Sequence, residues 1–133
     1  MIRIGVQTKG VVGDTSPREG FRLLKKAGFS CADFSLNAYL TNTLLYQNEK
    51  NTFFNQTDTE LERHFERHKY AARESGIAIN QMHMPYPMYV PGGKKRLNEY
   101  LRDIVAPKSL KICAHLECPY IVIHGFKLQH FLG

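Results

Sequence analysis

The sequence contains no tryptophan and no apolar run long enough to cross a membrane. A membrane-spanning helix needs about 20 consecutive apolar residues. The first ten residues also lack the basic segment followed by an apolar segment that marks a secretory signal. We therefore expect a cytoplasmic protein without a membrane partner.

Cysteine is scarce as well. The chain has three, Cys31, Cys113 and Cys118, without a CxxC pair and each in an apolar segment. Disulfide frameworks and structural zinc sites use more cysteines at closer spacing. Because free cysteine is among the most buried residue types, we expect three buried, unreactive thiols. An unpaired, odd number also fits a reducing compartment.

Acidic residues are outnumbered, with 12 Asp and Glu against 18 Lys and Arg and a net charge of +6. Such a charge suits nucleic acid, whose phosphates bind Lys and Arg. Most basic residues, however, are interleaved with acids along the predicted helices, as in residues 62–74, which is typical of a solvated helix face. The compact cluster Lys94, Lys95 and Arg96 is more typical of a surface loop than of a phosphate site. Nucleic acid is therefore not expected as a partner.

Size and composition fit one ordinary domain. The 133 residues are 43% hydrophobic and 23% charged, as in a globular protein with its own core. Short β-branched segments alternate with helical patterns throughout. The strands are predicted at residues 2–7, 31–36, 77–83 and 120–124.

Two of the intervening helices carry start signals. Ser16 precedes Pro17, and Glu19 completes the pattern of a capping box, in which the N-cap side chain and the third helical residue bond each other's backbone. Thr57 and Glu60 repeat that pattern before a second helix. Each helix is expected to end at a glycine, Gly28 and Gly76 respectively.

Two segments are less regular. A third helical pattern spans residues 97–116, and Pro107 must kink it or split it because proline has no amide hydrogen. Residues 37–56 are polar and dotted with aromatic side chains. That length is unusual for a loop and predicts a functional lid or a mobile segment.

The alternating order predicts an α/β fold with a parallel βαβαβαβ sheet over residues 1–133. An open doubly wound sheet is apolar on both faces because helices cover both. Here each strand has a face with polar groups, formed by Arg3 and Gln7 in the first and by Asp33 and Ser35 in the second. In the third, Gln81 and His83 share a face with Ile77 and Ile79, and in the fourth His124 lies with Tyr120 and Val122.

That parity favours the N-terminal half of a (β/α)8 TIM barrel, with a partly polar interior and a site at the C-terminal rim. Arg3 and Asp33 then point inward from neighbouring strands. We expect them to form an ion pair, because an isolated buried charge costs several kcal/mol.

Candidate site residues stand where the strands end. Gln7, Ser35 and Asn37 are predicted to bind substrate, and His83 and His124 are predicted to be catalytic. Histidine serves as a metal ligand, as a general acid or base, or as a donor to a sugar hydroxyl, and the sequence does not choose among these. The plainer alternative is two ordinary hydrogen-bonded histidines at the rim.

Other motifs carry weaker signals. His64 and His68 stand four residues apart on a helix, a spacing that can chelate a metal, but no HExxH motif or third ligand accompanies them. We expect a solvated face with one histidine turned partly inward. No glycine cluster has the spacing of a phosphate-binding loop.

Four segments together resemble a known family. They are IRIGVQ (2–7), GFRLLKKAGF (20–29), GIAINQMHMP (76–85) and LKICAHLECPYIVIH (110–124). Their order and spacing resemble the sugar phosphate isomerases/epimerases of the xylose-isomerase-like barrel superfamily. The resemblance implies a (β/α)8 barrel that holds a divalent metal (Mn, Mg, Co or Zn) through Glu, Asp and His on its later strands.

The same resemblance implies a sugar or sugar phosphate as substrate and a pocket lined by His83 and His124. In the related apurinic endonucleases the equivalent histidines bind zinc, so these two are partial ligands at most. The carboxylates of strands five to eight have no counterpart in the chain, and no complete metal site and no tight metal binding are expected.

Three functions remain open at this stage. The chain is a homologue or fragment of an isomerase/epimerase, inactive alone; or a non-catalytic half-barrel that self-associates through its exposed sheet edges as a homo-oligomer; or a DNA-repair protein related to the endonucleases. Unpaired strand edges favour association in either of the first two cases.

Overall fold

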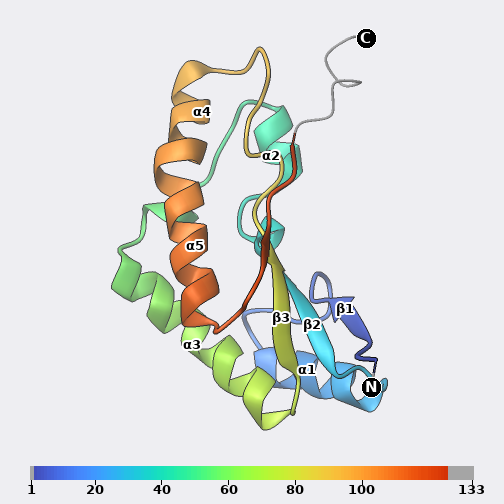
Figure 1. Ribbon diagram of the computed structural model, residues 1–133. Coiled ribbons are helices and arrows are strands. Elements are labelled where there is room, and N and C mark those ends of the chain that lie inside the picture. The colour runs from blue at the N-terminus through green and yellow to red at the C-terminus, as the bar shows by residue number, and fades with distance from the viewer. Residues whose placement is uncertain (1, 126–133) are drawn as a thin grey trace.

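A computed structural model of the chain describes residues 2–125 and has an α/β fold. Its sheet has four parallel strands in the order β1-β2-β3-β4, so each strand lies beside its neighbour in the sequence (Figure 1). The strands are β1 (Gly5–Gln7), β2 (Cys31–Ser35), β3 (Ala78–His83) and β4 (Ile121–Val122). The predicted parallel βαβ organisation is confirmed, with shorter first and last strands than expected.

Five α-helices connect and flank these strands. They are α1 (Pro17–Lys26), α2 (Asn42–Tyr46), α3 (Asp58–Glu74), α4 (Lys95–Tyr100) and α5 (Ala106–His115). Helix α3 packs against both α1 and α5, so the three long helices form one layer. That layer covers the face of the sheet from which Ala32, Phe34 and Met82 enter the core.

The two predicted capping boxes differ in outcome. Thr57 caps α3, since its Oγ1 accepts from the Glu60 amide and the Glu60 carboxylate accepts from the Thr57 amide. These bonds hold the pKa of Glu60 below its usual value. Ser16 precedes α1 as expected but makes no side-chain capping bond, and the Glu19 carboxylate binds Arg22 instead.

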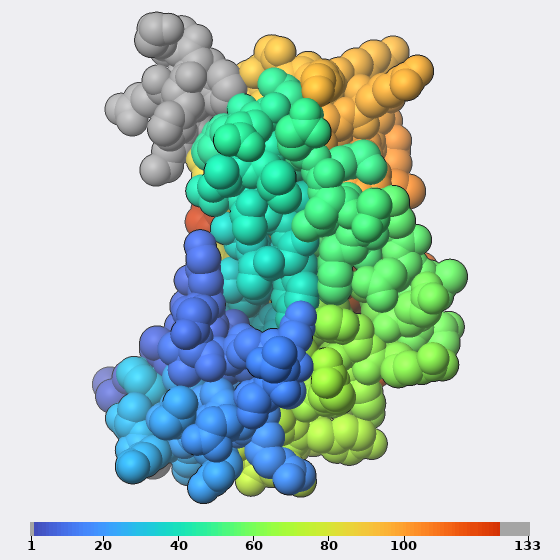
Figure 2. Space-filling view, turned by 180° about the vertical axis from the view of Figure 1, so that it is seen from behind, coloured from blue at the N-terminus to red at the C-terminus, as the bar shows by residue number. Residues whose placement is uncertain are grey.

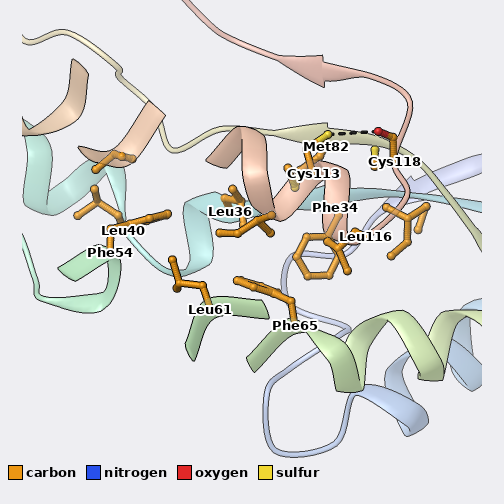
Figure 3. Packing of buried hydrophobic residues seen from close by; sticks show 14 of the residues in the cluster. Phe34, Leu36, Leu40, Phe54, Leu61, Phe65, Met82, Cys113, Leu116 and Cys118 are labelled. Atoms are coloured by element: carbon orange, nitrogen blue, oxygen red, sulfur yellow. Dashed lines mark hydrogen bonds between the residues drawn. The ribbon is translucent and has the colours of Figure 1, made fainter. Parts of the chain in front are cut away.

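The core lies between the sheet and the helix layer (Figure 3). Phe34 from β2 meets Phe65 from α3 edge to face, with ring centroids 5.8 Å apart. Both rings are excluded from solvent, and Met82 from β3 is fully buried in the same cluster. The predicted apolar face is confirmed, because Ala32, Phe34 and Leu36 all belong to the core cluster. Cys31 and Ser35, on the other face of β2, are buried as well.

Residues 37–56 do not form the predicted lid or mobile segment. They fold into two short 3-10 turns, Leu36–Ala38 and Phe53–Asn55, on either side of α2. Leu40, Leu45 and Phe54 from this stretch are completely buried in the core. Seen from behind, the segment forms the upper centre of the molecule, and α3 begins below it (Figure 2). Burial of these three apolar side chains holds the segment against the core.

The face parity predicted for the third strand is wrong. Ala32 of β2 pairs with Ile79 of β3, but the next residue, Asp33, pairs with Gln81. Asn80 is therefore an extra residue, a β-bulge that reverses the alternation. As a result Ile79 lies in the core, whereas Gln81 stands with Asp33 on the open face.

The predicted ion pair between Arg3 and Asp33 is also wrong. Arg3 precedes the first paired residue of β1, and its side chain is exposed to solvent. A hydrated guanidinium needs no buried counterion. The Asp33 carboxylate instead contacts His83 of the neighbouring strand.

Pro107 divides the third helical region as expected. A π-helical segment, Leu101–Val105, lies between α4 and α5, and Pro107 occupies the first turn of α5. The wider π-helical turn accommodates Pro107, which has no amide hydrogen, and the helical path continues into α5. Ser109 Oγ donates to the Val105 carbonyl at 2.7 Å and satisfies one of the carbonyls there.

The three cysteines are buried and free, as predicted. Burial raises the pKa of the Cys113 thiol to about 12, and it raises that of Cys118 as well. Both thiols donate to backbone oxygens, Cys113 to the Cys118 carbonyl and Cys118 to the Tyr120 carbonyl, each at 3.3 Å. Among the described helices, none has the length and apolar character to cross a bilayer.

Candidate functional site

A cavity of about 450 Å³ opens at the C-terminal ends of the strands. The five residues predicted from the sequence all line it, together with a lysine, an aromatic ring and two further residues of the rim. The lining residues are Gln7, Lys9, Ser35, Asn37, His83, Met84, Tyr86, His124 and Gly125. The cavity lies on the sheet face opposite the helix layer.

Asp33 and His83 form the central contact of this site. Asp33 Oδ1 lies 2.7 Å from His83 Nδ1, and both side chains are about four-fifths buried. An ionised carboxylate only accepts hydrogen bonds, so Nδ1 carries the proton in this contact. The other ring nitrogen, Nε2, is then left as the acceptor of neutral His83.

His124 stacks on His83 from the neighbouring strand end. The ring centroids are 5.0 Å apart and the planes differ by 15°. Tyr86 meets the same His124 ring edge-on at 5.6 Å, and Tyr46 lies beyond it at 6.2 Å from the Tyr86 ring. Burial, with Tyr86 alongside, raises the pKa of Tyr46 to about 12. Aromatic faces thus bound one side of the cavity.

Two hydrogen bonds from backbone amides hold the part of the cavity wall that contains Ser35 and Asn37. The Asn37 side-chain oxygen accepts from the Tyr86 amide at 3.2 Å, which ties the loop after β3 to the end of β2. Thr8 Oγ1 accepts from the Ser35 amide at 3.1 Å, and Thr8 itself is buried. Ser35 and Asn37 are therefore held in place by bonds that leave the Ser35 hydroxyl and the Asn37 amide nitrogen for other partners.

A second hollow of about 280 Å³ continues along the same face toward the N-terminal ends of the strands. Its lining includes the polar side chains of Arg3, Asp33 and Gln81 together with Val6 and Cys31. This face of the sheet thus carries polar groups on neighbouring strands, as the residue alternation in β1 and β2 predicts.

A metal does not fit the residues present. No group of three or more His, Cys, Asp or Glu side chains within residues 2–125 is arranged to hold an ion. Among the rim residues that the structure describes, Asp33 is the carboxylate in contact with a histidine, and its Oδ1 is already engaged by His83 Nδ1.

A second polar cluster lies outside the cavity. Asp14 Oδ1, from the loop after β1, lies 3.2 Å from Nε2 of both His64 and His68 and accepts from the Tyr39 hydroxyl at 2.6 Å. His68 is completely buried, whereas the His64 side chain is 21% exposed. The predicted inward turn of one histidine is confirmed for His68, but the expected solvated face is wrong at His64, which is mostly buried too. Their carboxylate partner Asp14 is distant in the sequence.

Titration of this cluster is strongly shifted. Burial lowers the pKa of His68 to about 4, although the nearby Asp14 charge acts in the opposite direction. Burial and the hydrogen bond to Asp14 raise the pKa of Tyr39. The neutral forms of both side chains are therefore favoured in the fold near pH 7.

Asp33 belongs to the site, although the sequence predicted that it pairs with Arg3. It stands two residues before the end of its strand, and it reaches His83 because the bulge at Asn80 places Gln81 beside Asp33 and His83 beside Ser35. A polar residue inside an otherwise apolar strand was the available signal. Without the register, its partner could not be chosen between Arg3 and His83.

No protein-family model, no curated protein and no solved structure matches this chain. The fold and the rim site show a parallel βαβ protein with a histidine-lined cavity.

Proposed function

We propose that the chain is the N-terminal half of a (β/α)8 barrel of the sugar phosphate isomerase/epimerase type, and that its rim cavity binds a sugar or sugar phosphate. The Asp33–His83 contact at the C-terminal ends of adjacent strands is the observation that carries the proposal. Sites of barrel enzymes lie at that end.

The sheet topology supports the barrel half. Four parallel strands follow one another in sequence order, and three helices form one layer over one face. A doubly wound sheet has helices on both faces and a reversal of strand order. A sheet face that carries polar groups opposite the helix layer, with histidines at its rim, is the arrangement expected inside one side of a barrel.

The chemistry of the rim suits proton transfer at a hydroxyl. With Nδ1 protonated toward Asp33, the Nε2 atom of His83 accepts a proton from a substrate hydroxyl, and the carboxylate stabilises the resulting imidazolium. His124, which stacks on His83, has no carboxylate partner among the described residues and serves to hydrogen-bond a second hydroxyl.

The lining also suits the substrate class. Amide and hydroxyl groups of Gln7, Ser35 and Asn37 match sugar hydroxyls, and the Tyr86 ring offers an apolar face. Lys9 places a positive charge at the cavity for a phosphate. The residues described here do not form the divalent-metal site that the resemblance implies, so sugar binding at the rim is proposed without it.

Ligand titration followed by NMR tests the proposal. A panel of pentose and hexose phosphates is added to the isotope-labelled chain, and shifts are expected at Gln7, His83 and His124. His83→Ala should weaken binding at least tenfold, whereas His115→Ala, on α5 and outside the cavity, should leave it unchanged. Shifts confined to other surfaces, or none across the panel, would refute the proposal.

An activity assay extends the test. Isomerisation by the chain should be absent or weak with Mn²⁺, Co²⁺ or Mg²⁺, because no metal site is formed within the described residues. Activity that a metal stimulates, and that His124→Ala abolishes, would instead make the chain an active enzyme.

A further inference from the structure

The outer edge of β1 presents backbone groups that no described strand pairs. Ile4 accepts from the Ser30 amide through its carbonyl at 3.0 Å, and the Thr8 amide donates to the Asp33 carbonyl at 2.9 Å. Successive residues of a parallel strand bond to opposite sides. The amide and carbonyl of Gly5 therefore point away from β2, toward the outer edge.

The outer edge of β4 has the same character. The Met82 and Met84 amides donate to the Tyr120 and Val122 carbonyls at 2.9 and 3.1 Å. By the same alternation, the backbone groups of Ile121 point away from β3. Within residues 2–125 no strand lies beyond β4.

Large apolar side chains accompany both edges. Beside β1, Ile2 and Ile4 are 91% and 62% exposed, and beside β4, Tyr120 and Ile123 are 70% and 58% exposed. Sheet edges that remain in water are usually blunted by charged side chains, prolines or bulges. Apolar residues at both edges indicate that both are covered.

We propose that a second copy of this chain covers both edges at once, with β4 of each copy pairing in parallel with β1 of the other to close eight strands into one barrel. The inference rests on the proposed half-barrel. Because the whole sheet is parallel, its two edges have the same direction and complementary bonding groups. A single unrelated strand would cover one edge, whereas two copies related by a twofold axis leave none.

Closure would complete the site. The C-terminal strand ends of both copies would lie at the same rim, so the open face with the Asp33–His83 pair would face its symmetry mate across a shared cavity. Each copy would then supply the wall that the other lacks. The cavity would be enclosed on all sides by βα units.

The net charge of the chain predicts how the dimer responds to salt. Each copy carries +6, so two copies repel each other at low ionic strength. An apolar, backbone-bonded interface is not weakened by salt. Association should therefore tighten as salt is raised, which is the opposite of a dimer held by ion pairs.

Sedimentation velocity of the full chain, with circular dichroism as a check on folding, tests the inference. The wild-type chain should sediment with twice the 15.3 kDa monomer mass. Ile4→Lys and Ile123→Lys, each at a different edge, should give folded monomers. Leu110→Lys, 51% exposed on α5, should stay dimeric and provides the matched control.

Three outcomes would overturn the inference. They are a folded wild-type monomer at high micromolar concentration, a dimer that survives both edge substitutions, and a mass that grows without limit, which indicates open head-to-tail chains. Sugar phosphate binding is measured separately by NMR on the same sample. A monomer that binds the sugar phosphate would refute only the proposed dimer. A dimer that binds no sugar phosphate would refute only the proposed function.

Discussion

His83 Nδ1 lies 2.7 Å from Asp33 Oδ1, across two adjacent parallel strands and fifty positions apart in the sequence. The contact fixes the orientation of the imidazole ring at the rim and sets which nitrogen faces the cavity. It also supplies part of the stability of the open sheet face, because both groups are mostly removed from solvent.

Asp33→Ala should lower the free energy of unfolding by about 1–3 kcal/mol, the usual cost of losing a hydrogen bond to a charged group. Asp33→Asn should cost less, since the amide oxygen still accepts from Nδ1. Chemical denaturation measures both. Glu49→Ala removes an exposed pair with Lys94 and should stay within about 0.5 kcal/mol. Equal losses at both positions would contradict a structural role for the contact.

Acid should destabilise the fold through His68. Its pKa is about 4 in the fold against an ordinary value of 6.5, so the unfolded chain binds more protons between those values. Stability should fall as pH drops from 6.5 to 4, by a contribution on the order of 3 kcal/mol. His68→Gln should flatten the curve of unfolding free energy against pH in that window. A variant with an unchanged slope would show that other groups dominate.

The two helix starts give a matched pair of cap variants. Thr57→Ala removes an observed capping box and should cost about 1 kcal/mol. Ser16→Ala removes a hydroxyl that makes no capping bond, and its effect should be much smaller. Thermal or urea unfolding compares the two variants directly. If Ser16→Ala lowered the free energy of unfolding as much as Thr57→Ala, the capping box would not explain the stability of α3.

The aromatic core should be intolerant of truncation. Phe65→Ala removes a fully buried ring that meets Phe34 edge to face, and it should cost about 3–5 kcal/mol. Tyr70→Ala, on the same helix but 56% exposed, should cost far less. Urea unfolding of the two variants checks the contrast. Similar losses in the free energy of unfolding would show that Phe65 is not central to the core.

Much of this fold follows from local sequence signals. Proline after Ser16 and the Thr57 box marked the starts of α1 and α3, and glycines with positive φ, Gly28 at 92° and Gly76 at 64°, follow their ends. Hydrophobic runs located all four strands. Each of these signals acts within a few residues, so it can be interpreted without tertiary contacts.

The rest depended on contacts between distant segments. Nothing near Leu40 or Phe54 indicates that they reach the core, because the stretch that holds them has no regular period. The partner of Asp33 required the register of β3, and that register depends on Asn80. The five rim residues were found from the sequence because strand ends meet at one edge of any parallel sheet.

That single bulge decides which way the third strand presents its histidine. Ile77 and Ile79 lie in the core, and unbroken alternation from them would place His83 on the same side, beneath the helices. With the bulge at Asn80, Ile79 and Met82 both enter the core, while Gln81 and His83 lie on the opposite face of the sheet. Regular pairing through Asn80, without the bulge, would exchange the rim histidine for Met82, so the bulge determines which side chain of β3 reaches the cavity.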